Sequence, residues 1–345
     1  MLFVRIFNLK CDIVMKVCVL GAGSFGTAIA NVLAHNGHST ILWGREAELI
    51  HDIQEKQINT TYLPDYNLDP NLNATNSIKD TVDCDITFLA IPTQFIRNTF
   101  KEYNIQLQSP IVVNLSKGIE QRTLLTGSQI LEQVAGISSD RFCVLTGPSH
   151  AEEVVRSIPS AVVVASSNSE TANTVQRALM NAFFRVYTSS DIIGSELAGS
   201  LKNVIAIAAG IIDGLKLGDN TKAAMFTRGI AEISRLGVAC GAEMATFYGL
   251  AGIGDLMVTC NSIHSRNRFV GEQIGKGNKL KDILAGMNSV AEGVITTSSA
   301  FEMSQKHNIE MPITEQMHQI LFDYKDPMKA MFDLMSRSSK SEIWW

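Results

Sequence analysis

A lysine and an asparagine stand side by side in a stretch that otherwise has the composition of a protein interior. The segment 195–214, SELAGSLKNVIAIAAGIIDG, consists almost wholly of small and branched apolar residues, yet it contains Lys202 and Asn203. Burying an unpaired ammonium group is so costly that chains avoid it or shift its pKa until the group is neutral. Lys202 is therefore predicted to be paired, to lie at a surface, or to take part in chemistry.

A glycine motif near the start of the chain predicts a phosphate-binding turn. In VCVLGAGSFGTAIANVLAHNG, Gly21, Gly23 and Gly26 have GxGxxG spacing directly after a strand-like run and at the start of a helical segment. The first glycine makes the tight turn, the second lets the backbone approach a pyrophosphate, and the third allows close helix–strand packing. The helix N-terminus adds N–H groups and a favourable dipole. The motif predicts dinucleotide binding, and the alternative is a purely structural turn.

The end of the next predicted strand, ILWGRE, bears on the choice of cofactor. About 20 residues beyond the glycine motif, an acidic residue typically binds the ribose of NAD, whereas an arginine accommodates the extra phosphate of NADP. Arg45 stands near that position, with Glu46 next to it. This favours NADP, or use of both NADP and NAD, unless Arg45 is a solvated loop charge.

Two further stretches place polar residues at predicted strand ends. NLSKGIE puts Lys117 after an apolar strand, and LTGPSHAEE puts Gly147 and Ser149 after another. Ligands of open α/β sheets bind at such carboxyl ends, so these residues are candidates for ligand contacts. Each alone also fits a capped helix or a surface charge.

The stretch NSIHSRNRF offers Ser265, Arg266 and Asn267 together, just after a glycine-rich turn that contains Asp255. An arginine beside hydrogen-bonding side chains suits a phosphate group, because its planar fork donates two parallel hydrogen bonds. The alternative is an arginine paired with a helical carboxylate across the domain interface.

Composition narrows the class of protein. The chain has 345 residues, 46% of them hydrophobic, which is comfortable for two globular domains. A formal net charge of -5 with scattered basic residues argues against nucleic acid or an anionic membrane as the main partner. An anionic ligand must then be bound by a local site.

The cysteines, the histidines and the N-terminal residues bear on the cellular compartment, on metal binding and on a signal peptide. The six cysteines show no CxxC spacing, which suits a reducing cytoplasm, and the seven histidines show no ligand spacing, so no metal is expected. The start MLFVRIFNLKCDIV is too interrupted by polar residues for a signal peptide. Met15 is therefore a candidate start, with residues 1–14 as an N-terminal extension or an extra edge segment.

Short β-branched runs alternate with helical segments until about residue 190, and long helical patterns follow. This pattern predicts an α/β fold, with a Rossmann-type, mainly parallel sheet in residues 15–190 and an all-α domain in residues 191–345. The predicted strands are Lys16–Leu20, Thr40–Trp43, Ile86–Ile91, Ile111–Leu115, Phe142–Leu145, Ala161–Ala165 and Arg185–Tyr187.

Six stretches in order give the chain a family resemblance. They are GAGSFGTA, SKGIE, GPSHAEEV, ELAGSLKNVIAIAAGIIDGLKLGDNTKAAMFTRG, GLAGIGDL and HSRN, and they closely resemble the bacterial NAD(P)-dependent sn-glycerol-3-phosphate dehydrogenases. The match extends from about Met15 to beyond Glu292. The resemblance implies a Rossmann domain followed by a helical domain, interconversion of glycerol 3-phosphate and dihydroxyacetone phosphate, and cytoplasmic supply of glycerol phosphate for phospholipid synthesis. A homodimer is expected.

The resemblance also implies roles for individual residues, with Lys202 as the general acid/base and Lys117 contacting both cofactor and substrate. The other residues that it places at the substrate are Gly147, Ser149, Asp255, Ser265, Arg266 and Asn267. Those that it places at the cofactor, beside the three motif glycines, are Ser24, Phe25, Arg45, Ala151, Arg266, Val290 and Glu292. The chain does not depart from the family pattern at these positions.

These roles make up a mechanism in which nicotinamide accepts or gives the hydride and Lys202 takes or gives the hydroxyl proton. Burial and the nearby Lys117 are expected to lower the pKa of Lys202 toward neutral pH. Asn203 and Asp255 are expected to orient that lysine or to bind the substrate.

Two other functions remain open. The first is another two-domain dehydrogenase, of the β-hydroxyacid type, that acts on a carboxylate instead of a phosphate substrate. The second is a binding module that senses NADP(H) without turnover. A proton carrier in an apolar helix argues against a sensor, because a sensor has no need of one.

Overall fold

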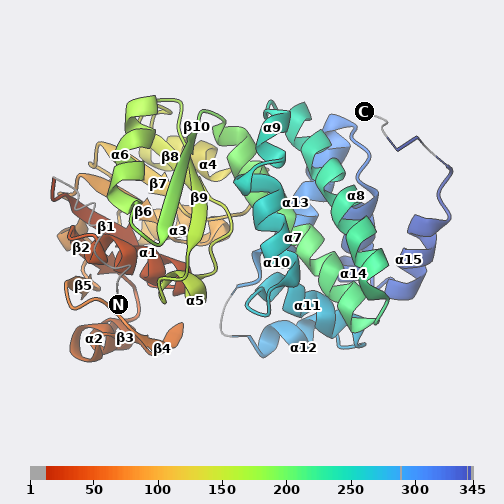
Figure 1. The fold of residues 1–345 in the computed structure, drawn as a ribbon, viewed down its shortest axis with the longest axis horizontal. Coiled ribbons are helices and arrows are strands. Elements are labelled where there is room, and N and C mark those ends of the chain that lie inside the picture. Colours follow the sequence, from red (N-terminus) through yellow and green to blue (C-terminus); the bar gives the residue numbers. More distant parts are fainter. Residues whose placement is uncertain (1–12, 288–289, 340, 343–345) are drawn as a thin grey trace. The chain divides into compact units, whose positions relative to one another are not determined.

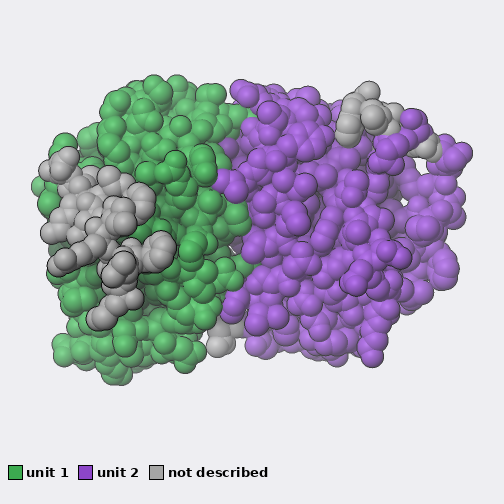
Figure 2. Space-filling model, in the orientation of Figure 1, with its two compact units in different colours: residues 1–116, 127–192 green, residues 117–126, 193–345 purple. Residues whose placement is uncertain are grey.

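The chain forms two compact units in the computed structural model, which describes residues 13–287, 290–339 and 341–342 (Figure 1). Unit 1 contains residues up to 116 together with 127–192, and unit 2 contains residues 117–126 and those from 193 onward (Figure 2). Most of the predicted extension, residues 1–12, lies outside the described residues.

Unit 1 is built on one eight-stranded sheet in the order β10-β9-β8-β7-β6-β1-β2-β5. All neighbours in it are parallel except β8 and β9, so the predicted Rossmann-type sheet is confirmed. The central strands are continuous apolar runs because both of their faces are buried. The strand bounds are β1 Lys16–Leu20, β2 Ser39–Trp43, β5 Leu72–Thr75, β6 Ile86–Leu89, β7 Ile111–Asn114, β8 Phe142–Thr146, β9 Ser160–Ala165 and β10 Phe184–Ser189.

Three short strands of unit 1 are absent from the predicted set. The edge strand β5 pairs with β2, and β3 (Ile58–Asn59) and β4 (Leu63–Asn67) form a separate antiparallel pair. Their sequences, LNAT, IN and LPDYN, are too short and polar to show the alternation of a strand.

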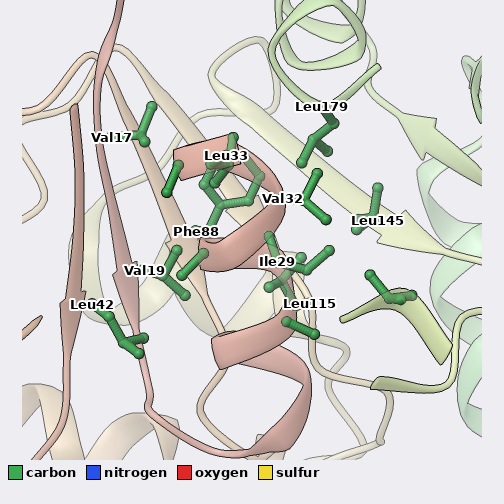
Figure 3. Packing of buried hydrophobic residues seen from close by; sticks show 14 of the residues in the cluster. Val17, Val19, Ile29, Val32, Leu33, Leu42, Phe88, Leu115, Leu145 and Leu179 are labelled. Atoms are coloured by element: carbon green, nitrogen blue, oxygen red, sulfur yellow. The ribbon is translucent and has the colours of Figure 1, made fainter. Parts of the chain in front are cut away.

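Six α-helices and two short 3₁₀ helices, Ile78–Thr81 and Thr93–Phe95, complete the described part of unit 1, and α1 carries the glycine motif at its start. Figure 3 shows Ile29 and Leu33 of α1 among Val19 and Phe88 of the sheet, and all four side chains are fully buried. This packing fixes the direction in which the N-terminus of α1 points. The helix bounds are α1 Ser24–His35, α2 Ala47–Lys56, α3 Ile96–Glu102, α4 Gly127–Ala135, α5 Ala151–Val154 and α6 Ser169–Leu179.

Unit 2 is helical, and its described residues contain no strand, in agreement with the predicted all-α domain. A five-residue π-helical segment, Leu250–Gly254, leads directly into α10. The bounds are α7 Ile192–Gly214, α8 Gly218–Ala239, α9 Met244–Phe247, α10 Asp255–Asn261, α11 Arg266–Gly275, α12 Leu280–Ala285, α13 Glu292–His307, α14 Pro312–Phe322 and α15 Pro327–Met335.

A ten-residue segment of unit 2 comes from the middle of the chain. Residues 117–126 fall within the predicted range 15–190, yet they cluster with the helical unit. Ile119 is fully buried in the apolar core of unit 2, and its carbonyl accepts a hydrogen bond from Ser299 at 3.2 Å. This excursion brings Lys117 into the same unit as Lys202.

Helix α7 is the central helix of unit 2. By length and composition it could cross a membrane, but 89% of its most apolar 18-residue window is buried inside the structure. A core helix of a soluble protein has the same character, so the apolar composition of α7 is explained by packing.

Close contact between α7 and α11 depends on glycines. A Cβ at Gly210 would lie 2.0 Å from the carbonyl oxygen of Arg268, and a Cβ at Gly271 would lie 2.0 Å from that of Ile207. The two backbones therefore touch directly, and this contact fixes the helix that carries Arg266 against the helix that carries Lys202.

Candidate active site

The glycine loop of unit 1 has the geometry of a phosphate-binding turn. Gly21 has a φ of +121°, and a Cβ there would lie 2.6 Å from the carbonyl oxygen of Ala90. A Cβ on Gly26 would lie 2.0 Å from the carbonyl oxygen of Gly21. A Cβ on Gly23 would meet nothing within 4 Å, so the loop is open to a ligand on that side.

The N-terminus of α1 fits an anionic group. Gly23 is the N-cap residue and makes no side-chain capping hydrogen bond, and Ser24 and Phe25 form the half-buried first turn. The first N–H groups of a helix need acceptors from outside the helix. The open side at Gly23, at the N-terminus of a helix, suits the pyrophosphate of a dinucleotide.

Arg45 follows β2, as the sequence predicts. Its side chain is 71% exposed, and its Nε lies 3.7 Å from Oε1 of Glu46. This loose contact leaves the guanidinium fork available to a phosphate group.

The turn after β8 carries Gly147, Ser149 and Ala151. Gly147 has a φ of +128°, a conformation that L side chains rarely adopt, and Ser149 Oγ donates to its carbonyl oxygen at 2.9 Å. Ala151 is buried at the start of α5. All three residues belong to unit 1, and their predicted ligand contacts stay predictions.

In unit 2, two lysines share one buried carboxylate. Lys202 Nζ lies 2.5 Å from Oδ1 of Asp255, and Lys117 Nζ lies 2.7 Å from Oδ2 of the same side chain. The Asp255 side chain is 2% exposed and that of Lys202 6% exposed. Of the three possibilities raised by the sequence, the structure shows a buried and paired lysine.

Burial has a large effect on the Lys202 ammonium group. Desolvation lowers its pKa to about 8; Asp255 acts in the opposite direction, and Lys117 lowers the pKa further. Burial would raise the pKa of Asp255, but the two lysines outweigh that effect and lower it. The Asp255 carboxylate therefore stays ionised beside the Lys202 amine, which titrates near neutral pH.

Thr259 completes the contacts of Lys202 and is missed by sequence reasoning. Its Oγ1 accepts a hydrogen bond from Lys202 Nζ at 2.6 Å and donates to Asp255 Oδ1 at 3.3 Å. Thr259 stands four residues after Asp255 on α10, and residues at this spacing share a helix face. That spacing is the signal that could have identified it. An ammonium group has three N–H donors, so one is left for a ligand.

Asn203 and Asn267 line the neighbouring part of unit 2. Asn203 Nδ2 donates to the carbonyl oxygen of Lys117 at 3.3 Å, and Asn267 Oδ1 accepts the backbone N–H of Gly293 at 3.0 Å. A Cβ on Gly293 would lie 2.8 Å from the Asn203 carbonyl oxygen, so Gly293 packs closely against Asn203 while its N–H bonds Asn267.

Ser265 and Arg266 form the start of α11. Ser265 Oγ accepts the backbone N–H of Arg268 at 3.2 Å and is the N-cap of the helix. Arg266 is exposed, and it makes no ion pair with any carboxylate in the described part of unit 2. The predicted alternative, an ion pair across the domain interface, stays a prediction.

The remaining predicted residues lie at the start of α13. Glu292 is its first residue and Val290 precedes it, and both are half-buried. As for metals, no group of three or more His, Cys, Asp or Glu side chains in the described ranges could hold an ion.

A Rossmann-type sheet with an open glycine loop, followed by a helical unit with a buried lysine of lowered pKa, defines a two-domain NAD(P)-dependent dehydrogenase. Comparison with known proteins narrows the class. Residues 16–172 match the N-terminal model of NAD-dependent glycerol-3-phosphate dehydrogenase, and residues 191–332 match the C-terminal model. The chain belongs to this family.

Individual relatives of the chain belong to the same family. The glycerol-3-phosphate dehydrogenase [NAD(P)+] of Lysinibacillus sphaericus is 47% identical over 331 residues, 95% of this chain and 98% of the relative. The crystal structure of glycerol-3-phosphate dehydrogenase from Coxiella burnetii is 36% identical, with a TM-score of 0.88 over 94% of this chain and 99% of that one. D-mandelate dehydrogenase has a TM-score of 0.60 at 12% identity over 90% of this chain and 98% of that one, which shows a shared fold alone.

Proposed function

We propose that this chain catalyses reversible hydride transfer between NAD(P)H and dihydroxyacetone phosphate, with sn-glycerol 3-phosphate as the reduced product. The observation that carries the proposal is the buried Lys202, whose pKa of about 8 lets its Nζ hold or release a proton near neutral pH. A sensor of NADP(H) would have no use for such a group.

The cofactor is proposed to bind along the glycine loop. Gly21, Gly23, Ser24, Phe25 and Gly26 would hold its pyrophosphate at the start of α1. Arg45 would bind the 2′-phosphate of NADP, and Ala151, Val290, Glu292, Lys117 and Arg266 would supply the other contacts. When bound, nicotinamide provides the hydride donor or acceptor.

The proton moves at Lys202 Nζ. In the direction of reduction, the ammonium group donates to the developing alkoxide, and in the direction of oxidation the neutral amine accepts the hydroxyl proton. Asp255 Oδ1 and Thr259 Oγ1 hold Nζ in place through contacts of 2.5 and 2.6 Å. Lys117 Nζ bonds Asp255, and Asn203 Nδ2 bonds the Lys117 carbonyl oxygen. Both side chains are proposed to bind the substrate oxygens.

The substrate phosphate is proposed to bind at the start of α11. Arg266 supplies a fork without a carboxylate partner in unit 2, and the helix N-terminus adds a favourable dipole. Ser265 and Asn267 flank it, although each already makes one structural hydrogen bond. Gly147 and Ser149 are proposed to complete the substrate site.

The cellular setting is proposed from the composition of the chain. An acidic chain whose described cysteines are all free suits the cytoplasm, with no nucleic acid or membrane as partner. Supply of glycerol phosphate for phospholipid synthesis follows from the proposed product. A homodimer is the expected assembly, and light scattering of the purified protein tests it.

The direct test is oxidation of NADPH and NADH by the purified protein, followed at 340 nm with dihydroxyacetone phosphate as substrate. Turnover should depend on the phosphate, so unphosphorylated dihydroxyacetone should react far more slowly. Faster reduction of small β-keto acids would favour the carboxylate-specific dehydrogenase. Tight NADPH binding without turnover of any of these substrates would favour the sensor.

A further inference from the structure

Asn59 lies far along the chain from the glycine loop but contacts it directly. It belongs to β3 and is fully buried. Its Nδ2 donates to the carbonyl oxygen of Ala22 at 2.9 Å and to Thr27 Oγ1 at 2.7 Å, and its Oδ1 accepts the backbone N–H of Tyr62 at 2.9 Å. Both donors and the acceptor of the side-chain amide are therefore in use.

The contact fixes the central peptide group of the loop. Ala22 stands between Gly21 and Gly23, and its carbonyl oxygen is also 3.4 Å from Thr27 Oγ1. The described chain contains no cis peptide bond, so the Ala22 carbonyl and the Gly23 N–H point in opposite directions from one rigid plane. A carbonyl held inward by Asn59 thus directs the Gly23 N–H away from the core.

That outward direction coincides with the open side of the loop. A Cβ on Gly23 would meet no atom within 4 Å, and within the described residues the Gly23 N–H donates to no acceptor. The two ends of the loop are held by backbone bonds, Gly21 N–H to Trp43 O at 2.9 Å and Thr27 N–H to Gly23 O at 2.9 Å. The middle peptide, with glycine on both sides of Ala22, relies on Asn59 and Thr27.

We propose that Asn59 is a positioning residue for the cofactor, because it keeps the Ala22–Gly23 peptide in the orientation that offers an N–H to the pyrophosphate. Without this amide the peptide can rotate about its flanking bonds and turn the Ala22 carbonyl outward, where its oxygen would repel the phosphate oxygens. The inference rests on the proposed position of the cofactor at the glycine loop.

The test compares cofactor affinity among matched variants. Asn59→Asp keeps the shape and the acceptor for Tyr62 but cannot donate to Ala22, and Thr27→Val removes the supporting hydroxyl. We expect the Kd of NADPH, measured by fluorescence titration, to rise about tenfold in Asn59→Asp and by about two- to fivefold in Thr27→Val. Thr27→Ser keeps the hydroxyl and should restore the wild-type value.

Two control variants are needed. The first distinguishes a change in cofactor affinity from a loss of protein stability, and the second tests whether the cofactor binds at the glycine loop. Asn36 bonds the carbonyl oxygen of Ala178 at 2.8 Å at the other end of α1, so Asn36→Ala should lower the melting temperature without changing the NADPH affinity. Gly23→Ala fits the fold, because Gly23 has a φ of -70° and open space around it, but its methyl group should obstruct the pyrophosphate. At saturating NADPH, KM for dihydroxyacetone phosphate should stay within twofold in the Asn59 and Thr27 variants.

The outcomes are distinguishable. Weaker binding in Gly23→Ala with an unchanged Kd in folded Asn59→Asp would overturn the role of Asn59 and leave the cofactor at the loop. If Asn59→Asp does not fold, an equal Kd in Thr27→Val and Thr27→Ser overturns it instead. An unchanged Kd in Gly23→Ala would remove the cofactor from the loop and thereby overturn both proposals.

Discussion

Lys202 Nζ lies 2.5 Å from Oδ1 of Asp255, and both side chains are almost completely buried. With a pKa of about 8, Lys202 should give opposite pH profiles in the two directions. Reduction needs the protonated amine, so its kcat/KM should fall as pH rises through about 8. Oxidation needs the neutral amine and should become faster over the same range. Profiles with the same sign in both directions would contradict this assignment.

Asp255→Asn tests whether the charge of Asp255 sets the pKa of Lys202. Asp255 raises the pKa of Lys202, so an uncharged amide of the same shape should let that pKa fall. The decline of the reduction rate should then occur at lower pH than in the wild-type enzyme, with a lower maximum. A decline that stays in place or moves to higher pH would show that Asp255 does not set the protonation of Lys202.

Arg45→Ala should separate the two cofactors. One charge-assisted hydrogen bond from an exposed arginine to the 2′-phosphate corresponds to about a tenfold increase in KM for NADPH. KM for NADH should remain within about twofold, because NADH lacks that phosphate. The assignment fails if both constants rise together.

Arg266→Lys keeps the positive charge but loses the planar fork. We expect kcat/KM for dihydroxyacetone phosphate to fall about 10- to 100-fold, with little change in melting temperature or in the slow reaction of unphosphorylated dihydroxyacetone. Arg268→Lys is the matched control, since Arg268 bonds Asp213 at 2.8 Å and should affect stability instead. Equal loss with both substrates would remove Arg266 from the phosphate site.

Gly271→Ala should destabilise unit 2 although alanine is the better helix former. The helix preference favours alanine by about 1 kcal/mol. However, the new Cβ would lie 2.0 Å from the carbonyl oxygen of Ile207, and such overpacking typically costs about 1–3 kcal/mol or more. A lower urea midpoint is expected. Gly286→Ala, whose Cβ would have 3.7 Å to its nearest neighbour, should leave the midpoint almost unchanged.

Much of the fold could be predicted from the sequence because the central strands are short, continuous apolar runs and α7 is a long apolar segment. Helix α4 shows where local pattern misleads. The sequence of Leu124–Val134 predicts a helical segment, but Leu124 has a left-handed φ of +59° and α4 begins at Gly127. Leu124 belongs to the core of unit 2, so tertiary packing overrides the local preference.

Local sequence pattern alone predicts the residue types of the site, whereas the contacts of Lys202 with Lys117 and Asp255 are expected only through the family resemblance. The charged residue in an apolar helix identifies Lys202, since burial without a partner is too costly. Its partner Asp255 lies 53 residues away, and Lys117 lies 85 residues away on the segment that leaves unit 1. Such pairings depend on how helices and loops pack, and a local sequence pattern does not predict them.

The most direct test of the account is the turnover of Lys202→Met, a variant that keeps most of the side-chain volume in the buried helix. Loss of the general acid should lower kcat for dihydroxyacetone phosphate reduction by about 10²- to 10⁴-fold, with the fold and NADPH affinity retained. If this variant kept more than about a tenth of wild-type turnover, well below the loss of a general acid, Lys202 would be a structural lysine and the proposed mechanism would be wrong.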